Sequence, residues 1–276
     1  MKLLSPKDYA KVNAALQRVS FNNLFARSVV EHQISGQVFV DNTEAPESFY
    51  IVHPYGMSLL LGRSDDPVFN AAFKEHALNT NKSRNKHEWM QAYPNKWHLV
   101  LCELFGDKLI ANAQNTGQQQ HGIVELNSRV NFKFNIEKYQ AVSHKSTAPG
   151  VAVVETDREL FRKMEGSVTP NFFWDSEDDF LANGKAFSLL DNNQLAATAF
   201  SAYMTSDKLE LGIETLPAFR GKGYAAAVSA ALIDFCISNN YEPLWSCRLE
   251  NTGSVMLAQK LGFEVALTFP YYRLSN

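Results

Sequence analysis

The strongest constraint on this chain is a short basic loop between a strand pattern and a helix pattern. The loop reads RGKGYA at residues 220–225, after the apolar stretch LELGIETLPAF and before AAVSAALIDFCISNN. The first amides of a helix lack intrahelical partners and carry partial positive charge, so anions bind there readily. Two glycines let an anion approach the backbone closely, and two basic side chains add full charges. The loop therefore predicts a phosphate site, with a pyrophosphate as the expected guest.

The spacing of the loop excludes two common nucleotide motifs. The G-x-x-x-x-G-K-[ST] pattern of a P-loop is absent. Ala226 stands where G-x-G-x-x-G needs its third glycine, and the next expected strand ends in WSCR at 245–248 without a carboxylate. Taken alone, the loop remains compatible with a basic turn that only caps the helix.

A second segment favours the cofactor interpretation over the turn. Residues 251–263 read NTGSVMLAQKLGF, which predicts a short helix ended by Gly262. The two segments resemble the hallmarks of the GCN5-related N-acetyltransferase (GNAT) superfamily. The first resembles its [RQ]-x-x-G-x-[GA] signature, with Arg220, Gly223 and Ala225 in the defined positions, and the second N-x-x-[AS]-x-x-L-x-x-K-L-G-F. The resemblance implies that the loop amides hold the pyrophosphate of acetyl-CoA.

Composition limits the classes of partner. The chain has 276 residues and a formal net charge of −3, which gives no electrostatic case for nucleic acid or an anionic membrane. It has no apolar run of membrane-spanning length, and its N-terminus does not read as a signal peptide. Its three widely spaced cysteines form neither a metal motif nor a disulfide framework. We expect a cytoplasmic protein without a metal, acting on a small molecule, whose oligomeric state the sequence leaves open.

The order of predicted elements separates two parts of the chain. The small, polar stretch AVSHKSTAPG at 141–150 reads as a linker. After it the expected order, β-α-(α)-β-β-β-α-β-α-β-β, resembles the GNAT fold. We therefore expect an α/β (α+β) protein with two domains. A smaller α/β domain at 1–140, which is a degenerate GNAT-like copy in one interpretation, precedes a GNAT domain at 150–276. The GNAT domain is expected to have a mixed, splayed central sheet. The expected strands lie at 37–40, 48–53, 107–111, 122–126, 131–134, 151–155, 186–190, 195–204, 209–215, 244–248, 263–269 and 271–273. The expected helices lie at 6–19 (capped by Ser5), 22–32, 68–78, 88–104 (interrupted at Pro94) and 223–239, and two more begin at 157 and 254. Residues 112–122 are expected to form an exposed loop.

The whole chain resembles a narrower group, the two-part GNAT proteins that include the zwittermicin-resistance acetyltransferases. The residues that carry this resemblance are WSC at 245–247 followed by the second motif. The resemblance implies transfer of an acetyl group to a primary amine of a small molecule, an antibiotic-like compound being one candidate, by direct attack of the amine on the thioester.

Such a transfer needs a base for the amine and an N–H donor for the developing oxyanion. In GNATs the strand before the phosphate loop diverges from its neighbour and binds the pantetheine arm, which here implicates the amides around Thr215 and Leu216. Glu210 and Glu214 lie on one face of this strand, if it is regular, and both are candidate bases. Glu214 is preferred because it is nearer the expected thioester, while the alternative is that either is a solvated strand residue.

The leaving thiolate lacks its usual proton donor. Many GNATs place a tyrosine where this chain has Ala258. Ser254, one helical turn earlier, is the candidate donor, unless it is an ordinary polar residue and the thiolate leaves unaided. Asn251 either contacts the cofactor arm or caps the helix. The expected catalytic residues are thus Glu214 and Ser254, and the expected cofactor-binding residues are Thr215, Leu216, Arg220, Gly221, Lys222, Gly223, Tyr224, Ala225 and Asn251.

Two other functions remain open at this point. A catalytically idle acyl-CoA-binding sensor or scaffold would keep the phosphate loop but release no CoA in the presence of an amine. A protein acetyltransferase would need an open acidic groove for a peptide, and the mild net charge neither supports nor excludes one.

Overall fold

The computed structural model describes residues 1–111, 121–142 and 149–276. The chain forms two compact units, the first made of residues 1–130, 248–250 and 268–276 and the second of residues 131–247 and 251–267. Strands β7 (Val124–Phe134) and β13 (Phe263–Leu274) contribute residues to both. The division into domains at 1–140 and 150–276 stays a prediction. Most of the predicted loop at 112–122 and of the predicted linker at 141–150 lies outside the described residues.

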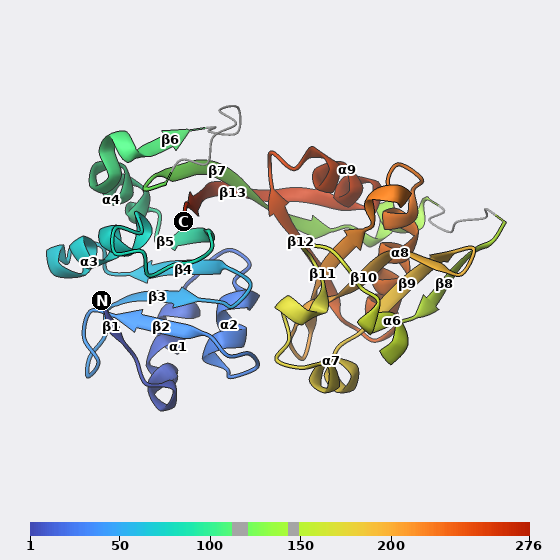
Figure 1. The fold of residues 1–276 in the computed structure, drawn as a ribbon, viewed down its shortest axis with the longest axis horizontal. Helices are drawn as coiled ribbons and strands as arrows, with labels where there is room; N and C mark the ends of the chain where they lie inside the picture. The colour runs from blue at the N-terminus through green and yellow to red at the C-terminus, as the bar shows by residue number, and fades with distance from the viewer. Residues whose placement is uncertain (112–120, 143–148) are drawn as a thin grey trace. The chain divides into compact units, whose positions relative to one another are not determined.

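The first unit is a mixed sheet with helices (Figure 1). Its strands pair in the order β1-β2-β3-β4-β5, and these pairs are antiparallel except for the parallel pair β4–β5. The end of β13 pairs antiparallel with the other edge of β5. A buried cluster that includes Tyr50, Phe73, Trp97 and Tyr272 holds α3 and α4 to the sheet. The elements are β1 (Lys2–Leu3), η1 (Pro6–Val12), α1 (Asn13–Leu16), α2 (Leu24–Val30), β2 (Gln37–Val40), β3 (Ser48–Val52), β4 (Met57–Gly62), α3 (Pro67–Ala77), β5 (Glu88–Tyr93), α4 (Lys96–Phe105), η2 (Gly106–Lys108) and β6 (Leu109–Ala111), which pairs with β7.

The second unit repeats this plan. Its strands pair in the order β8-β9-β10-β11-β12, again antiparallel except for the last, parallel pair. Helix α8 packs on β9, β10 and β11. The elements are α5 (Ile136–Gln140), β8 (Val151–Glu155), α6 (Arg158–Arg162), η4 (Pro170–Phe172), α7 (Glu177–Asn183), β9 (Ala186–Asp191), β10 (Gln194–Met204), β11 (Lys208–Thr215), η5 (Pro217–Phe219), α8 (Tyr224–Ser238), β12 (Glu242–Arg248) and α9 (Thr252–Lys260).

The two parallel pairs differ in how far they run together. In the first unit β4 and β5 stay paired over five positions, from Met57↔Trp89 to Leu61↔Tyr93. In the second unit β11 and β12 pair over only three, ending at Glu210↔Leu244, although β11 continues to Thr215. The predicted splay of the central sheet is therefore present at the strand that leads into the RGKGYA loop.

Several predicted elements are wrong in detail. Residues 88–93 were expected to be helical but form β5, because their backbone pairs with β4 and β13. The two strands expected at 122–126 and 131–134 are the single strand β7. Likewise, 263–269 and 271–273 form one strand, β13, which passes through Pro270 without a break. Ser5 makes no side-chain cap, and the segment after it begins as a 3₁₀ helix.

Candidate active site

The outer half of β11 has one paired edge and one open edge. The N–H of Leu216 donates to the carbonyl of Ala196 at 3.0 Å, on the β10 side. Successive N–H groups of a strand point to opposite edges, so the N–H groups of Ile213 and Thr215 face the β12 side, where the ladder has already ended at Glu210. These two amides are placed to pair with an extended ligand. The amide of Leu216, which was also expected near the thioester, is engaged with β10.

The RGKGYA loop has the backbone form that an anion site needs. Gly221 and Gly223 have φ of +79° and +82°, a region that favours glycine, and a Cβ added at either would meet no atom within 4 Å. Gly223 is the N-cap of α8 and supplies no side-chain cap. The first helical bond runs from the N–H of Ala226 to the carbonyl of Gly223 at 3.1 Å, which leaves the N–H groups of Tyr224 and Ala225 ahead of the ladder. The residues present fit a bound pyrophosphate.

One acidic side chain already faces this loop. Oδ2 of Asp191, at the end of β9, accepts a hydrogen bond from the Tyr224 hydroxyl at 2.8 Å and one from Lys222 Nζ at 3.2 Å. These two hydrogen bonds lower the pKa of Asp191, and the bond from Tyr224 has the larger effect. Lys222 therefore reaches across to Asp191, while the Arg220 side chain is largely exposed and donates from Nε to the carbonyl of Thr215 at 3.1 Å. Asp191 was not among the residues predicted for the site.

Glu214 holds a neighbouring loop in place. Its Oε2 accepts hydrogen bonds from the backbone N–H groups of Ser167 and Val168, both at 3.0 Å, and its Oε1 lies 3.7 Å from the Arg220 guanidinium. Gly166, at φ +130°, packs so closely that an added Cβ would lie 2.6 Å from the carboxylate carbon. The other candidate base, Glu210, is buried and accepts a hydrogen bond from the Ser246 hydroxyl at 2.5 Å. Of the two carboxylates, only Glu214 borders the pocket described next.

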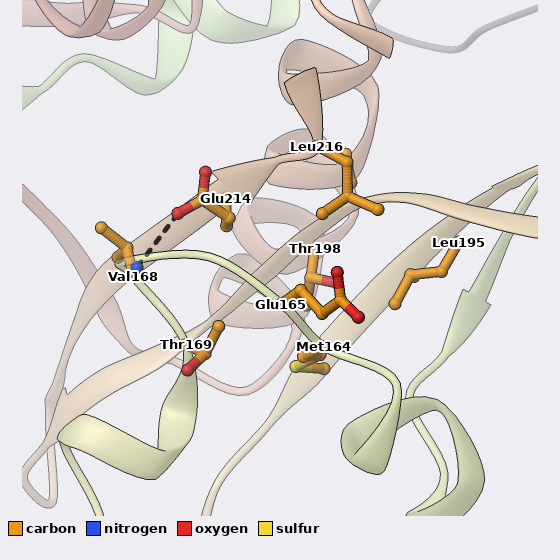
Figure 2. Close-up of a pocket in the computed structure, with 9 residues that line it drawn as sticks. Met164, Glu165, Val168, Thr169, Leu195, Thr198, Glu214 and Leu216 are labelled. Atoms are coloured by element: carbon orange, nitrogen blue, oxygen red, sulfur yellow. Dashed lines mark hydrogen bonds between the residues drawn. The ribbon is translucent and has the colours of Figure 1, made fainter. Parts of the chain in front are cut away.

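A pocket with an enclosed volume of about 10 Å³ lies between the loop at 164–169 and strands β10 and β11. Figure 2 shows Glu214 and Leu216 on one wall and residues of the loop on the other. The described lining residues are Met164, Glu165, Val168, Thr169, Leu195, Ala197, Thr198, Glu214 and Leu216. Most of these were absent from the sequence prediction. The signal that could have found the loop is the run EGSVTP at 165–170, where an acid, a glycine and a proline follow a short helix.

The start of α9 is organised around Ser254. Asn251 caps the helix, its Oδ1 accepting from the N–H of Ser254 at 3.2 Å. The Ser254 hydroxyl oxygen accepts from Trp245 Nε1 at 3.1 Å. Because a serine hydroxyl can donate while it accepts, this contact fixes Ser254 and leaves its proton for another partner. Ala258, at the position of the usual tyrosine, is fully buried, and Ser254 is not among the described residues lining the pocket.

The family model for GNAT acetyltransferases matches residues 16–272. The chain belongs to the GNAT acetyltransferase family. The match spans both compact units, so this GNAT acetyltransferase is a member of the family over almost its whole length.

Relatives and solved structures agree with this assignment. The chain is 25% identical over 256 residues to an uncharacterized N-acetyltransferase, YdfB, from Bacillus subtilis (strain 168), covering 90% of this chain and 89% of that protein. A GCN5-related N-acetyltransferase-like protein from Streptococcus suis 89/1591 superposes with a TM-score of 0.70 at 19% identity, covering 96% of this chain and 98% of the other. A tandem GNAT protein from the clavulanic acid biosynthesis pathway superposes with a TM-score of 0.61 at 8% identity, covering 99% and 97%. At these low identities both structures show the fold alone.

None of the helices among residues 1–111, 121–142 and 149–276 is long and apolar enough to cross a membrane. Over the same residues, no group of three or more histidine, cysteine, aspartate or glutamate side chains is arranged to hold a metal ion.

Proposed function

We propose that this acetyltransferase moves an acetyl group from acetyl-CoA to a primary amine of a small molecule. The observation that carries the proposal is the divergence of β11 from β12 after Glu210, directly before the unblocked N-terminus of α8. An open strand edge suits the amide groups of a pantetheine arm, and an open helix start suits a pyrophosphate. Bound there, acetyl-CoA would supply an activated acyl carbonyl.

The residues expected to hold acetyl-CoA fall into two groups. Ile213 and Thr215 offer strand-edge amides, with Leu216 packing beside them. The loop offers backbone N–H groups and two cations for the phosphates, through Arg220, Gly221, Lys222, Gly223, Tyr224 and Ala225. The Asn251 side-chain oxygen caps α9, which leaves its exposed amide nitrogen as the proposed contact for the cofactor arm.

Glu214 and Ser254 are proposed to handle the protons. Glu214 borders the pocket next to Thr215 and is the carboxylate placed to take a proton from an incoming amine, directly or through water. Ser254, held by Trp245, is proposed to donate a proton to the departing thiolate. The pocket beside β11 is the proposed acceptor site.

The first unit is proposed to bind no second acetyl-CoA. At its equivalent position, the start of α3, the side chain of Asp66 accepts from the N–H groups of Val68 and Phe69 at 2.9 and 3.0 Å, so a carboxylate already occupies the helix end. Its strands β4 and β5 also stay paired and offer no open edge there.

Calorimetric titration with acetyl-CoA, followed by CoA release with a panel of amines, tests this function. We expect one acetyl-CoA per chain and CoA release that depends on the amine. Binding without amine-dependent release from any member of the panel would instead support a sensor or scaffold, an alternative that the alanine at position 258 keeps open. An absence of binding would contradict the proposal.

A further inference from the structure

The pocket beside β11 carries an unbalanced negative charge. Two carboxylates, Glu165 and Glu214, line it, and none of its described lining residues is basic. Glu214 is engaged with two backbone N–H groups and lies near Arg220. Within the part of the chain that the structure describes, the carboxylate of Glu165 takes part in no hydrogen bond or ion pair. The pocket therefore holds one carboxylate whose charge these residues leave unmatched.

The remaining lining is mostly apolar. Met164, Val168, Leu195, Ala197 and Leu216 supply hydrophobic walls. The two threonines of the lining, Thr169 and Thr198, are buried. The enclosed volume of the pocket is only about 10 Å³, about the space of one water molecule, so a ligand would lie against these walls from the solvent side rather than inside a closed cavity. An apolar wall with a carboxylate on it favours a short alkyl chain that carries a cation.

The two carboxylates are directed differently. In Figure 2 the Glu214 carboxylate is turned toward Val168, whereas the Glu165 carboxylate points away from Val168. Glu214 and Leu216 belong to the strand end that is the proposed site of the thioester, whereas Glu165 belongs to the facing loop. A ligand whose amine reacts beside Leu216 can therefore place a second charged group against Glu165.

We infer that Glu165 selects the acceptor, and that the acceptor is a small organic dication of the alkyl diamine class, with one amine to be acetylated and a second, cationic group bound by Glu165. The role of the first amine rests on the proposed function, but recognition of the second group is a binding property that needs no transfer.

Calorimetry with 1,5-diaminopentane and n-pentylamine tests the inference, because the two probes share a chain length and differ by one charge. In CoA-saturated protein at pH 7.5 we expect the diamine to bind about fivefold more tightly, the upper range for an ion pair at an exposed carboxylate. Glu165→Gln should remove this difference. Glu159→Gln, which alters an exposed glutamate of α6 paired with Lys163, changes the net charge equally and should preserve it.

Three outcomes decide the matter. Equal binding of the two probes by the wild-type protein, or a difference that survives in Glu165→Gln, overturns the inference. A preference lost equally in Glu159→Gln also overturns it, because the effect would then come from net charge. Titration of the same preparations with acetyl-CoA is read separately: absent acetyl-CoA binding with intact, Glu165-dependent diamine preference would contradict the proposed function and support the role of Glu165.

Discussion

The carboxylate of Glu214, on β11, accepts a hydrogen bond from the backbone N–H of Val168 at 3.0 Å, and so fixes one wall of the pocket to the strand that leads into the RGKGYA loop. The same oxygen accepts from the N–H of Ser167. The candidate base is thus also a support of the proposed acceptor site, and these two roles can be separated by choosing the substitution.

Glu214→Gln should lower kcat by about 100-fold, the usual contribution of a positioned base, with the affinity for acetyl-CoA little changed. The glutamine oxygen can still accept from Ser167 and Val168, so the loop should keep its position. Glu214→Ala should lose both the base and the support, and should also lower the melting temperature by about 2–4 °C, corresponding to about 1 kcal/mol. Steady-state kinetics and thermal melting of both variants make the test. Full activity in Glu214→Gln would remove this residue from the chemistry.

The unblocked start of α8 predicts a strong charge effect at Gly223. Gly223→Asp places a carboxylate at the helix end and should weaken acetyl-CoA binding more than tenfold while leaving the protein folded. Gly223→Asn is the matched control, because it has nearly the same shape, tolerates positive φ and has no charge. Calorimetry should show the aspartate variant binding much more weakly than the asparagine variant. Equal affinities would mean that the phosphates bind elsewhere.

The sequence predicted those parts of the site that local chemistry determines. The loop glycines, the start of α8 and the cap at Asn251 follow from residues next to one another in the chain, and the structure has these local features. Residues contributed by distant segments were missed. Asp191 contacts Lys222 across 31 positions, and Glu214 contacts the loop at 167–168 across more than 40. The strand β5 was mistaken for a helix because its pattern, EWMQAY, is too short to show a period, and only pairing with β4 and β13 decides it.

The contact between Asp191 and Lys222 predicts a restraint on cofactor binding. A bound pyrophosphate would compete with Asp191 for Lys222, and the carboxylate would repel it. Asp191→Asn should therefore tighten acetyl-CoA binding about threefold, and the gain should shrink as salt is raised from 0.05 to 0.5 M because the Lys222 side chain is about half exposed and salt screens its charge. Weaker binding in this variant would show instead that Asp191 orients Tyr224 or Lys222 for the cofactor.

Ser254 can be tested for proton donation by comparing alanine with threonine. Ser254→Ala should slow acetyl transfer about tenfold and should leave Trp245 Nε1 without its acceptor, which a change in tryptophan fluorescence would report. Ser254→Thr keeps a hydroxyl and should restore most of the rate. If alanine and threonine give the wild-type rate alike, the thiolate leaves without help from this residue.

His53, buried where β3 turns into β4, predicts acid sensitivity of the first unit. The pKa of His53 is lowered from 6.5 to about 3, mainly because the ring is buried and to a smaller extent because of the positive charge of Lys86. Between these pH values the unfolded chain binds a proton that the folded chain does not, so stability falls as the pH decreases from 6.5, by up to about 1.4 kcal/mol per pH unit. In His53→Asn, the new side chain can still accept the hydrogen bond that Tyr55 N–H donates to Nδ1 at 3.0 Å, but cannot titrate.

Urea unfolding at pH 7.5 and pH 5.0 measures this effect. Over that interval the wild-type protein should lose about 2 kcal/mol more stability than His53→Asn, since 1.5 pH units of the interval lie below 6.5. Staying at or above pH 5.0 avoids the titration of the carboxylates, whose ordinary pKa values are lower. An identical pH dependence in the two proteins would mean that His53 gains its proton without unfolding, and would place it in a more solvated setting than the buried turn described above.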